Sequence, residues 1–239
     1  MSAVHVAFEI SSLFQRTTPG LDLEQARAEV VARTQGQGAA FPDERIDDIT
    51  VEYQRISAML AESGVLYAAS CFGRFDGDWS MGSLVIGLQP LSYRDPEIAV
   101  AGMAKILAAE HGPSAEVSAI ALPCGQATLV IRQSPDLRLP AEFTESGEDI
   151  PIDVAQLQAF IPVPPDAVPG AQTLVTVVFS TPSTDHWADY CELLVPFLDS
   201  LSFLPDQEAG EDTDAATDCR TPVRQSLPSV SGGPEGAFG

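Results

Sequence analysis

The feature that most constrains this sequence is a pair of strand-like segments around an Asp-Gly turn. The segments VLYAASCFGRF (65–75) and WSMGSLVIGLQPL (79–91) are rich in β-branched and aromatic residues, and Asp76-Gly77-Asp78 lies between them. Two such segments joined by an Asp-Gly pair favour a hairpin, because Asp and Gly accept the positive φ angles of a tight turn. The sequence therefore predicts an antiparallel strand pair.

Further segments have strand patterns. Apolar residues alternate over 4–10, which is typical of a half-buried strand. Later strands are expected at 115–121, 126–133, 154–162 and 172–180. The last of these, QTLVTVVFS, is almost continuously apolar, which predicts a central strand covered on both faces. The acidic, Pro-containing connection 134–153 is expected on the surface, and the Pro-rich segment 162–170 is expected to be a stiff turn.

Helix signals lie between these strands. Asp22 and Gln25 have the spacing of a capping box, which predicts a helix over 23–34, followed by a loop at 35–40. A second helix is expected from Asp43 to about Gly64, and a third over 95–110, opened by Asp95-Pro96-Glu97. The second helix carries apolar residues at three- and four-residue steps, namely Ile46, Ile49, Tyr53, Ile56 and Leu60. The expected fold class is α+β, a mainly antiparallel sheet with helices packed on it.

The segment FSTPSTDHWADYCELL (179–194) contains Ser183, Asp185, His186 and Cys191, residue types that occur in nucleophilic sites. On a helix, residues five apart point about 140° from each other, so His186 and Cys191 diverge. Asp185 is adjacent to His186 and points about 100° away. These side chains therefore make no catalytic group by themselves.

The same segment fits a strand end followed by a helix. Residues 181–184 are expected to end the strand and cap the helix, with Asp185 near the positive helix terminus. Pro196 should kink this helix or divide it. The expected buried stripe is Trp187, Cys191, Leu194, Leu198 and Leu201, flanked by Tyr190 and Phe197.

No residue pattern predicts a catalytic, cofactor or metal site, and no cofactor is expected. The histidines His5, His111 and His186 lie far apart in the sequence, without an HxH or HExxH pattern. The cysteines Cys71, Cys124, Cys191 and Cys219 form no CxxC pair. Whether Cys71, Cys124 and Cys191 converge in space is open at this point. The chain has no GxxxxGK[ST] phosphate loop and no GxSxG nucleophile elbow.

The charge of the chain restricts its partners. Its formal net charge is -22, and it contains one lysine, Lys105, and no asparagine. Few cations are present to displace the counterions of a nucleic acid, so nucleic-acid binding is not expected. Binding to anionic lipid is unfavourable for the same reason, and the sequence has no apolar segment long enough to span a membrane. The N-terminus lacks the basic and apolar regions of a secretory signal, so a cytoplasmic location is expected.

Composition changes near residue 205. Residues 206–218 carry six acidic side chains and no basic one, and the remainder is rich in Ser, Gly and Pro. Such a segment buries too little apolar surface to offset its ordering entropy, so 205–239 are expected to be a disordered tail. Residues 1–204 are expected to form one domain.

The tip of the predicted hairpin is the one group of varied, exposed-looking side chains. It contains Arg74, Asp76, Asp78 and Trp79. Trp and Arg are frequent anchors of protein interfaces, so a partner contact is one interpretation. The other is a solvated turn from which Trp79 returns to the core. Asp76 and Asp78 alone supply too few ligands for calcium.

The segment FSTPSTDHWADYCELLVPFLDSLSFLP (179–205) resembles the end of Mog1/PsbP-like domains. The residues that carry the resemblance are Trp187, Tyr190, Phe197, Ser200 and Phe203. It implies an α/β/α sandwich around an antiparallel sheet, an architecture often used as a binding or accessory module. The chain is also similar to uncharacterised bacterial proteins of this architecture.

These observations favour a non-enzymatic accessory or protein-interaction module with an unknown protein partner. An alternative is an immunity- or inhibitor-like protein whose acidic surface blocks a basic partner. A third, less favoured, is an enzyme whose site is formed by residues distant in the sequence.

Overall fold

The computed structural model describes residues 4–36, 42–63, 65–139, 141, 144 and 146–205. The α-helices are α1 (Leu23–Gly36), α2 (Asp43–Glu62), α3 (Pro96–His111) and α4 (Trp187–Ser200), and short 3₁₀ helices are η1 (Gly112–Ser114) and η3 (Thr184–His186). The strands are β1 (Val4–Ala7), β2 (Phe14–Arg16), β3 (Val65–Phe75), β4 (Asp78–Pro90), β5 (Ala115–Leu122), β6 (Gly125–Leu139), β7 (Ile150–Pro162), β8 (Thr173–Thr181) and β9 (Ser202–Pro205).

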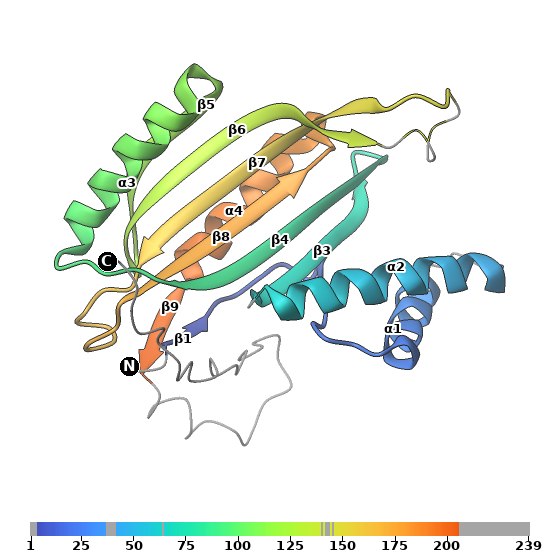
Figure 1. Cartoon of the computed structure of the whole chain (residues 1–239), viewed down its shortest axis with the longest axis horizontal. Helices are drawn as coiled ribbons and strands as arrows, with labels where there is room; N and C mark the ends of the chain where they lie inside the picture. Colours follow the sequence, from blue (N-terminus) through green and yellow to red (C-terminus); the bar gives the residue numbers. More distant parts are fainter. Residues whose placement is uncertain are drawn as a thin grey trace, which may run out of the picture.

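A large antiparallel sheet organises the molecule (Figure 1). Its seven strands have the order β2-β3-β4-β8-β7-β6-β5, so β8 is the central strand, as its apolar sequence predicted. The first and last strands, β1 and β9, pair separately as a two-stranded ribbon. The predicted α+β class with a mainly antiparallel sheet and packed helices is confirmed.

Helices lie on both faces of the sheet (Figure 1). On one face α4 covers the centre, where Tyr190 packs against Phe179 of β8 at a ring separation of 4.8 Å. On the other face α3 packs over β5 and β6, where Thr128 donates a hydrogen bond to the Val100 carbonyl. Phe179 and Thr128 belong to opposite faces, because the cross-strand partner of Phe179 is Leu157, and that of Thr128 is Phe160. The arrangement is therefore helix, sheet, helix.

The buried face of α4 differs from the predicted one. Leu194, Leu198 and Leu201 are buried, but Trp187 and Cys191 are only half-buried. The centre of the face is made by Tyr190 and Phe197, which were expected at its margin. Trp187 packs at the margin of the core, against Phe179, so the predicted stripe was wrong for Cys191 and placed Trp187 too centrally. Tyr190 contacts Phe75 of β3, Ser80 of β4 and Phe179 of β8, and Phe197 packs on Phe8, so this side of the helix faces the sheet.

The predicted break at Pro196 does not occur, since α4 is one helix from Trp187 to Ser200. Pro196 lies on the exposed side of α4. Because proline has no backbone N–H, the carbonyl of Glu192, four residues earlier and also exposed, receives no helical hydrogen bond. Water can bond to this carbonyl, which removes most of the penalty that a buried proline would carry.

Two predicted helix starts are confirmed in detail. The Gln25 backbone donates to Asp22 Oδ1 at 2.8 Å, and the Asp22 backbone donates to Gln25 Oε1 at 3.1 Å, which is a complete capping box. At α3, Asp95 Oδ1 accepts a hydrogen bond from the Glu97 backbone at 2.8 Å. The start of α4 differs from prediction, because η3 precedes the helix and no side chain caps it.

Several strand boundaries differ from prediction. β6 continues to Leu139 and β7 begins at Ile150, so much of the connection expected over 134–153 belongs to strands. The short strands β2 and β9 were not predicted; each is stabilised by pairing with a distant segment. The face of β8 that bears Thr176, Val178 and Ser180 is only half-buried, so this strand is not fully covered on both faces as expected.

The helix α2 buries small polar side chains. Its fully buried residues are Thr50 and Ser57, whereas Ile56 is exposed and the rest of the apolar stripe is half-buried. Thr50 Oγ1 donates to the Ile46 carbonyl, and Ser57 Oγ donates to the Thr18 carbonyl at 2.7 Å. The apolar spacing therefore predicted the helix correctly but does not mark its buried side.

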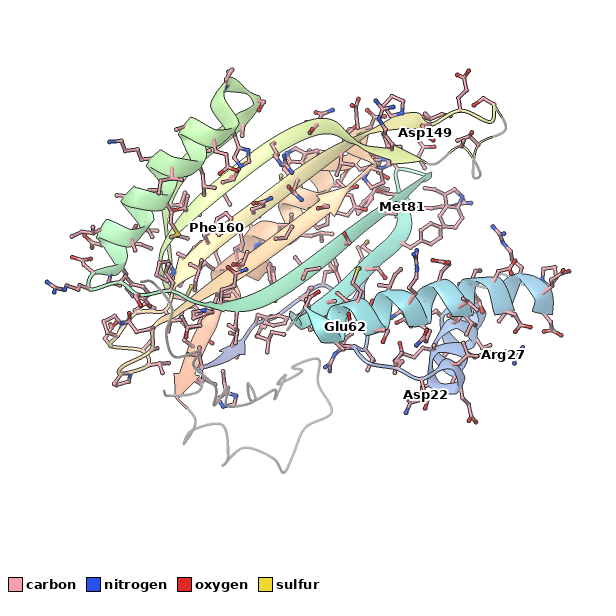
Figure 2. All side chains as sticks on the ribbon, viewed as in Figure 1. Asp22, Arg27, Glu62, Met81, Asp149 and Phe160 are labelled. Atoms are coloured by element: carbon pink, nitrogen blue, oxygen red, sulfur yellow. The ribbon has the colours of Figure 1, made fainter. Side chains whose placement is uncertain are left out.

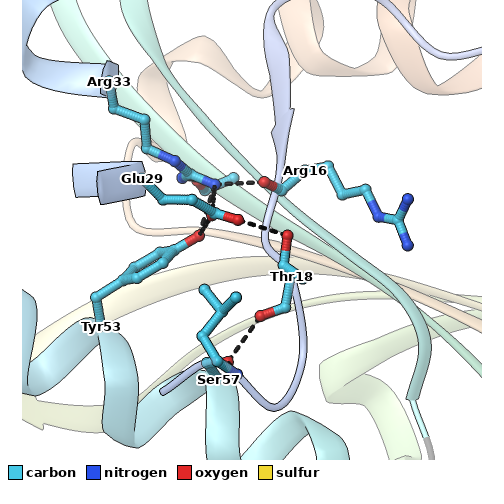
Figure 3. Close-up of polar contacts among 8 residues, drawn as sticks. Arg16, Thr18, Glu29, Arg33, Tyr53 and Ser57 are labelled. Carbon is cyan, nitrogen blue, oxygen red and sulfur yellow. Dashed lines mark hydrogen bonds and ion pairs between the residues drawn. The ribbon is translucent and has the colours of Figure 1, made fainter. Parts of the chain in front are cut away.

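A polar network joins α1 and α2 to the edge of the sheet (Figure 3). Thr18 and Tyr53 each donate to Glu29 at 2.6 Å, one to each carboxylate oxygen. Arg33 donates to the Tyr53 hydroxyl at 2.7 Å, to the Arg16 carbonyl, and to Ser70 Oγ of β3 at 3.2 Å. The α1–α2 pair is thus held to β2 and β3 mainly by directional hydrogen bonds.

Because of this network, we expect the free energy of unfolding to fall at alkaline pH. Burial, reinforced by the hydrogen bond to Glu29, raises the pKa of Tyr53 from 10.0 to about 12. Because the folded state favours the neutral phenol, this stabilisation is complete below pH 10 and is lost as the pH approaches 12. The loss should be on the order of 1 kcal/mol, less than the full shift implies, because the ring is partly exposed to solvent.

Urea unfolding of the wild type and Tyr53→Phe at pH 9 and at pH 11.5 tests this expectation. The variant should be less stable at pH 9, because Glu29 and Arg33 lose a partner, but its stability should fall less between the two pH values. The pKa values of Tyr67, Tyr93 and Tyr190 are also raised by burial, so only the difference between the two proteins reports on Tyr53. Equal declines would contradict the role of Tyr53.

Some predictions fall outside the described residues. These are Gly64 at the end of α2, most of the 35–40 loop, Cys219, and the tail from residue 206 onwards. The strand β9 includes Pro205, the first residue of the predicted tail. Within the part of the chain that is described, no helix is long and apolar enough to cross a membrane.

Candidate functional site at the hairpin tip

The β3–β4 hairpin closes with a two-residue turn at Asp76 and Gly77. Both residues have positive φ angles, 50° and 97°, which is the geometry of a type I′ turn. The cross-strand pairs next to the turn are Phe75 with Asp78, Arg74 with Trp79, and Phe72 with Met81. Their register decides which side chains share a face.

One face of this tip exposes Phe72, Arg74, Trp79 and Met81, which we call the tip patch. The side chains of Phe72, Trp79 and Met81 are 44%, 58% and 48% exposed. The rings of Phe72 and Trp79 stack with centroids 4.9 Å apart and planes 17° from parallel. The Arg74 guanidinium lies 4.5 Å from the centroid of the Trp79 ring, within cation–π distance. The patch is therefore ordered by its own contacts although it is exposed.

The other face of the tip is fixed to α4. Phe75 packs edge to face on Tyr190 with centroids 5.2 Å apart, and Ser80 Oγ shares a buried hydrogen bond of 2.8 Å with the Tyr190 hydroxyl. Gly82 lies so close to the rings of Phe179 and Tyr190 that no side chain fits there. This packing supports the tip patch from behind.

Two hydrogen bonds also connect the patch strand to the segment before α4. Thr181 Oγ1 donates to the Met81 carbonyl at 2.6 Å, and the Met81 backbone donates to Ser183 Oγ at 3.2 Å. Figure 2 labels Met81 at the end of the hairpin that is remote from α3. Ser183, which was considered as a nucleophile, thus positions the hairpin.

The remaining members of the 183–191 group do not assemble into a nucleophilic site. Asp185 is exposed and Cys191 is half-buried on α4. The His186 ring packs against Phe75 at 5.5 Å, and its Nδ1 atom is buried without a hydrogen-bond partner among the described residues. A catalytic base needs an orienting partner at this atom.

Histidines and acidic residues do not converge on a metal-binding arrangement in the described residues. His5 lies in β1, His111 at the end of α3 and His186 in η3, on three separate elements. No group of three or more His, Cys, Asp or Glu side chains with metal-binding geometry occurs among the described residues. The Asp76 and Asp78 carboxylates lie in this part of the chain and therefore have no third ligand there.

The three described cysteines are free thiols on separate elements. Burial raises the pKa of Cys71, Cys124 and Cys191 above the usual thiol value. A thiol with a raised pKa contains little thiolate at neutral pH and is a poor nucleophile. Cys71 is in β3 beside Tyr190, Cys124 is in the β5–β6 turn, and Cys191 is in α4.

Two surface hollows lie elsewhere on the molecule. One, of about 330 Å³, is lined by residues that include Glu116, Arg132 and Trp187. The other, of about 440 Å³, is lined by residues that include Cys124, Asp166 and Asp199. No histidine lines either hollow, so neither contains the nucleophile–histidine pair of a serine- or cysteine-type site.

The predicted tip residues are therefore together and exposed, and the set is larger than predicted. Trp79 does not return to the core, so the interpretation of the tip as a solvated turn with a buried tryptophan was wrong. Phe72 and Met81 were missed. The period of two along each strand places residues 72 and 74 on one face, and 79 and 81 likewise, so the alternation could have identified them.

Comparisons with known proteins add no assignment. No protein-family model matches the chain, and no curated protein matches its sequence.

Proposed function

We propose that this chain is a non-enzymatic protein-interaction module and that its tip patch contacts the partner. The observation that carries the proposal is the exposed Trp79 ring, stacked on Phe72 and covered on one side by Arg74. Trp, Met, Phe and Arg are enriched at the centres of protein interfaces, whereas isolated exposed tryptophans are uncommon on inert surfaces. The architecture is compatible with the proposed Mog1/PsbP-like fold, which is commonly used for binding.

The rigidity of the patch supports this role. A side chain that is already ordered loses little conformational entropy when it is bound, so more of the contact energy appears as affinity. Here the stacking of Trp79 and the attachment of the hairpin to Tyr190 provide that order. The partner should offer an apolar pocket for the indole and a hydrogen-bond acceptor for the Arg74 guanidinium.

The Trp79→Ala variant tests the proposal. The tagged wild type, Trp79→Ala and Val51→Ala should be purified from the protein's own cells and their bound proteins quantified by mass spectrometry. Val51 is a matched control, because it is exposed to a similar extent, but on α2. A partner recovered in stoichiometric amount with the wild type should bind Trp79→Ala about 30-fold or more weakly, as at an interface hot spot.

Two results would contradict the proposal. One is that no stoichiometric partner is recovered by the wild type. The other is that the partner binds Trp79→Ala and Val51→Ala equally well. In a reconstituted complex, the fluorescence of Trp79 should also shift to shorter wavelength as its ring leaves water.

The net charge of -22 favours a second candidate, an immunity- or inhibitor-like protein that blocks a basic partner. The two mechanisms differ in their salt dependence. Binding through acidic complementarity should weaken steeply with added salt, because mobile ions screen exposed charges. Binding through the tip patch should change little with salt and should be abolished by Trp79→Ala.

A further inference from the structure

One lateral edge of the large sheet is a long strand without the usual protection. β5 has eight residues, AEVSAIAL, and forms the edge next to β6. It contains no proline and no basic residue, its one charged residue is Glu116, and its pairing with β6 is regular, without a bulge. The opposite edge, β2, is only three residues long. Edge strands usually carry lysines, prolines or bulges that prevent pairing with another strand.

The outer side of β5 has unused hydrogen-bonding capacity. In an antiparallel pair, alternate residues direct their backbone N–H and C=O groups away from the partner strand. Within the described residues, the backbone hydrogen bonds of β5 are those of its ladder with β6. An added strand is the structure that pairs all of these outward groups at once.

The helix that flanks this edge is also incompletely covered. Ten of the sixteen residues of α3 are Ala, Val, Ile, Leu or Met, but Val100 alone is fully buried in the described structure. Ile98 is 72% exposed and Ile106 is 65% exposed. With Gly102 and Ala109, they lie on one side of the helix at four-, four- and three-residue steps. A helix that is apolar on all sides is normally buried.

We propose that the β5 edge and the exposed side of α3 together bind a second copy of this chain. A two-fold axis perpendicular to the sheet, between the midpoints of the two β5 strands, would pair them antiparallel and extend the sheet across both copies. Because such an axis keeps the faces of the sheet aligned, the two α3 helices come to lie side by side. A single strand from another protein would cover the edge but leave Ile98 and Ile106 in water.

The β5 sequence suits this self-pairing. Opposite residues in antiparallel strands share a face, so one residue at the centre must face its own copy across the axis, and in mid-strand this is Ser118 or Ala119. In the first register Glu116 lies opposite Ile120, and in the second it lies opposite Leu122. Neither register places like charges opposite each other, which would destabilise the pair.

The size of the surface is sufficient for a reversible dimer. β5 is about 26 Å long and α3 about 24 Å, from their rises per residue. Together they form a face about 20 Å deep, so roughly 500 Å² per copy, or about 1,000 Å² in total, would be covered. This is the lower size of specific interfaces, so we expect association at micromolar rather than nanomolar concentration.

Salt should strengthen the dimer. Each copy has a net charge of -22, whereas the exposed side of α3 carries the single lysine of the chain, Lys105. Electrostatic repulsion between the two acidic copies opposes association, and added salt screens this repulsion. Salt has little effect on the β5 backbone hydrogen bonds or on the packing of the isoleucines. The expected salt dependence is thus opposite to that of a charge-driven complex.

Sedimentation velocity of the full chain provides the test, at protein concentrations of roughly 1–200 µM and at low and high salt. The wild type should show a monomer–dimer equilibrium that shifts toward dimer with both protein and salt. Ile106→Glu on α3 and Ala119→Lys on β5 should each weaken it about tenfold or more. Val195→Glu, at a similarly exposed site on α4, should leave it unchanged, and circular dichroism should confirm that all variants are folded.

Three outcomes would overturn the inference. The wild type could remain monomeric over the whole range, the dimer could persist in both Ile106→Glu and Ala119→Lys, or Trp79→Ala could abolish it. The last result would show that the copies associate through the tip patch instead. Because β5 and the tip patch are at different places in the sheet, this test and the partner-binding test can fail independently.

Discussion

Phe179→Ala should lower the free energy of unfolding by about 3–5 kcal/mol, the largest loss we expect from a single truncation in this chain. Phe179 is in the central strand β8 and is fully buried. Its ring contacts Phe14 of β2, Trp187 and Tyr190 of α4, and lies against Gly82 of β4. Truncation leaves a cavity between the sheet and α4, because all four of these neighbours belong to other elements.

Chemical denaturation, followed by circular dichroism, measures this loss, and Phe72→Ala is the matched control. Phe72 is also in the sheet and also stacks on an aromatic ring, but its side chain is 44% exposed. Its truncation should cost less than about 1 kcal/mol. Since domains of this size are stable by about 5–15 kcal/mol, Phe179→Ala would remove a large part of the total. Similar losses in the two variants would contradict the position of the core between β8 and α4.

Gly82→Ala should destabilise the protein by about 1–3 kcal/mol although it adds only a methyl group. A Cβ atom at this position would lie 2.7 Å from Cε2 and 2.8 Å from Cζ of Phe179, and 3.3 Å from Cε1 of Tyr190. Both rings are enclosed in the core and cannot move aside without displacing β8 or α4. The strain should also disturb the tip patch, because Met81 of the patch is adjacent to Gly82 and Ser80, which bonds to Tyr190, is two residues away.

Gly73→Ala is the control for this second prediction. Gly73 is in the neighbouring strand of the same hairpin, and a Cβ atom there would meet no atom within 4 Å. Its replacement should be neutral or slightly stabilising, because alanine restricts the unfolded chain. In a Phe179→Leu background, Gly82→Ala should cost less than in the wild type, since the opposing ring is gone. Additive effects would show that the strain arises elsewhere.

Patterns between residues close in the sequence predicted most of the elements. The Asp-Gly turn, the Asp22–Gln25 capping box and the Asp95 cap each depend on bonds within a few residues. The period of two in β3 and β4, and the apolar run of β8, depend on local repetition as well. Such signals identify an element because the interactions that form it lie within the segment and do not depend on the rest of the chain.

The candidate site was predicted only in part. Arg74, Asp76, Asp78 and Trp79 were recognised from their residue types beside a turn, but whether Trp79 is buried depends on which face α4 covers. Tyr190 packs on the face that bears Phe75 and Ser80, and this leaves Phe72, Trp79 and Met81 in solvent. No property of the hairpin alone distinguishes these faces, since both carry aromatic side chains.

The chain's local sequence therefore indicates most of its elements, two of its helix caps and its acidic character. Contacts between distant segments decide the remainder. Pairing with β3 and β1 creates β2 and β9, docking of α4 makes Tyr190 rather than Trp187 the centre of its buried face, and the strand order leaves β5 at an edge. The physical reason is that hydrogen bonds in caps and turns connect neighbours, whereas burial is a property of a surface that many segments form together.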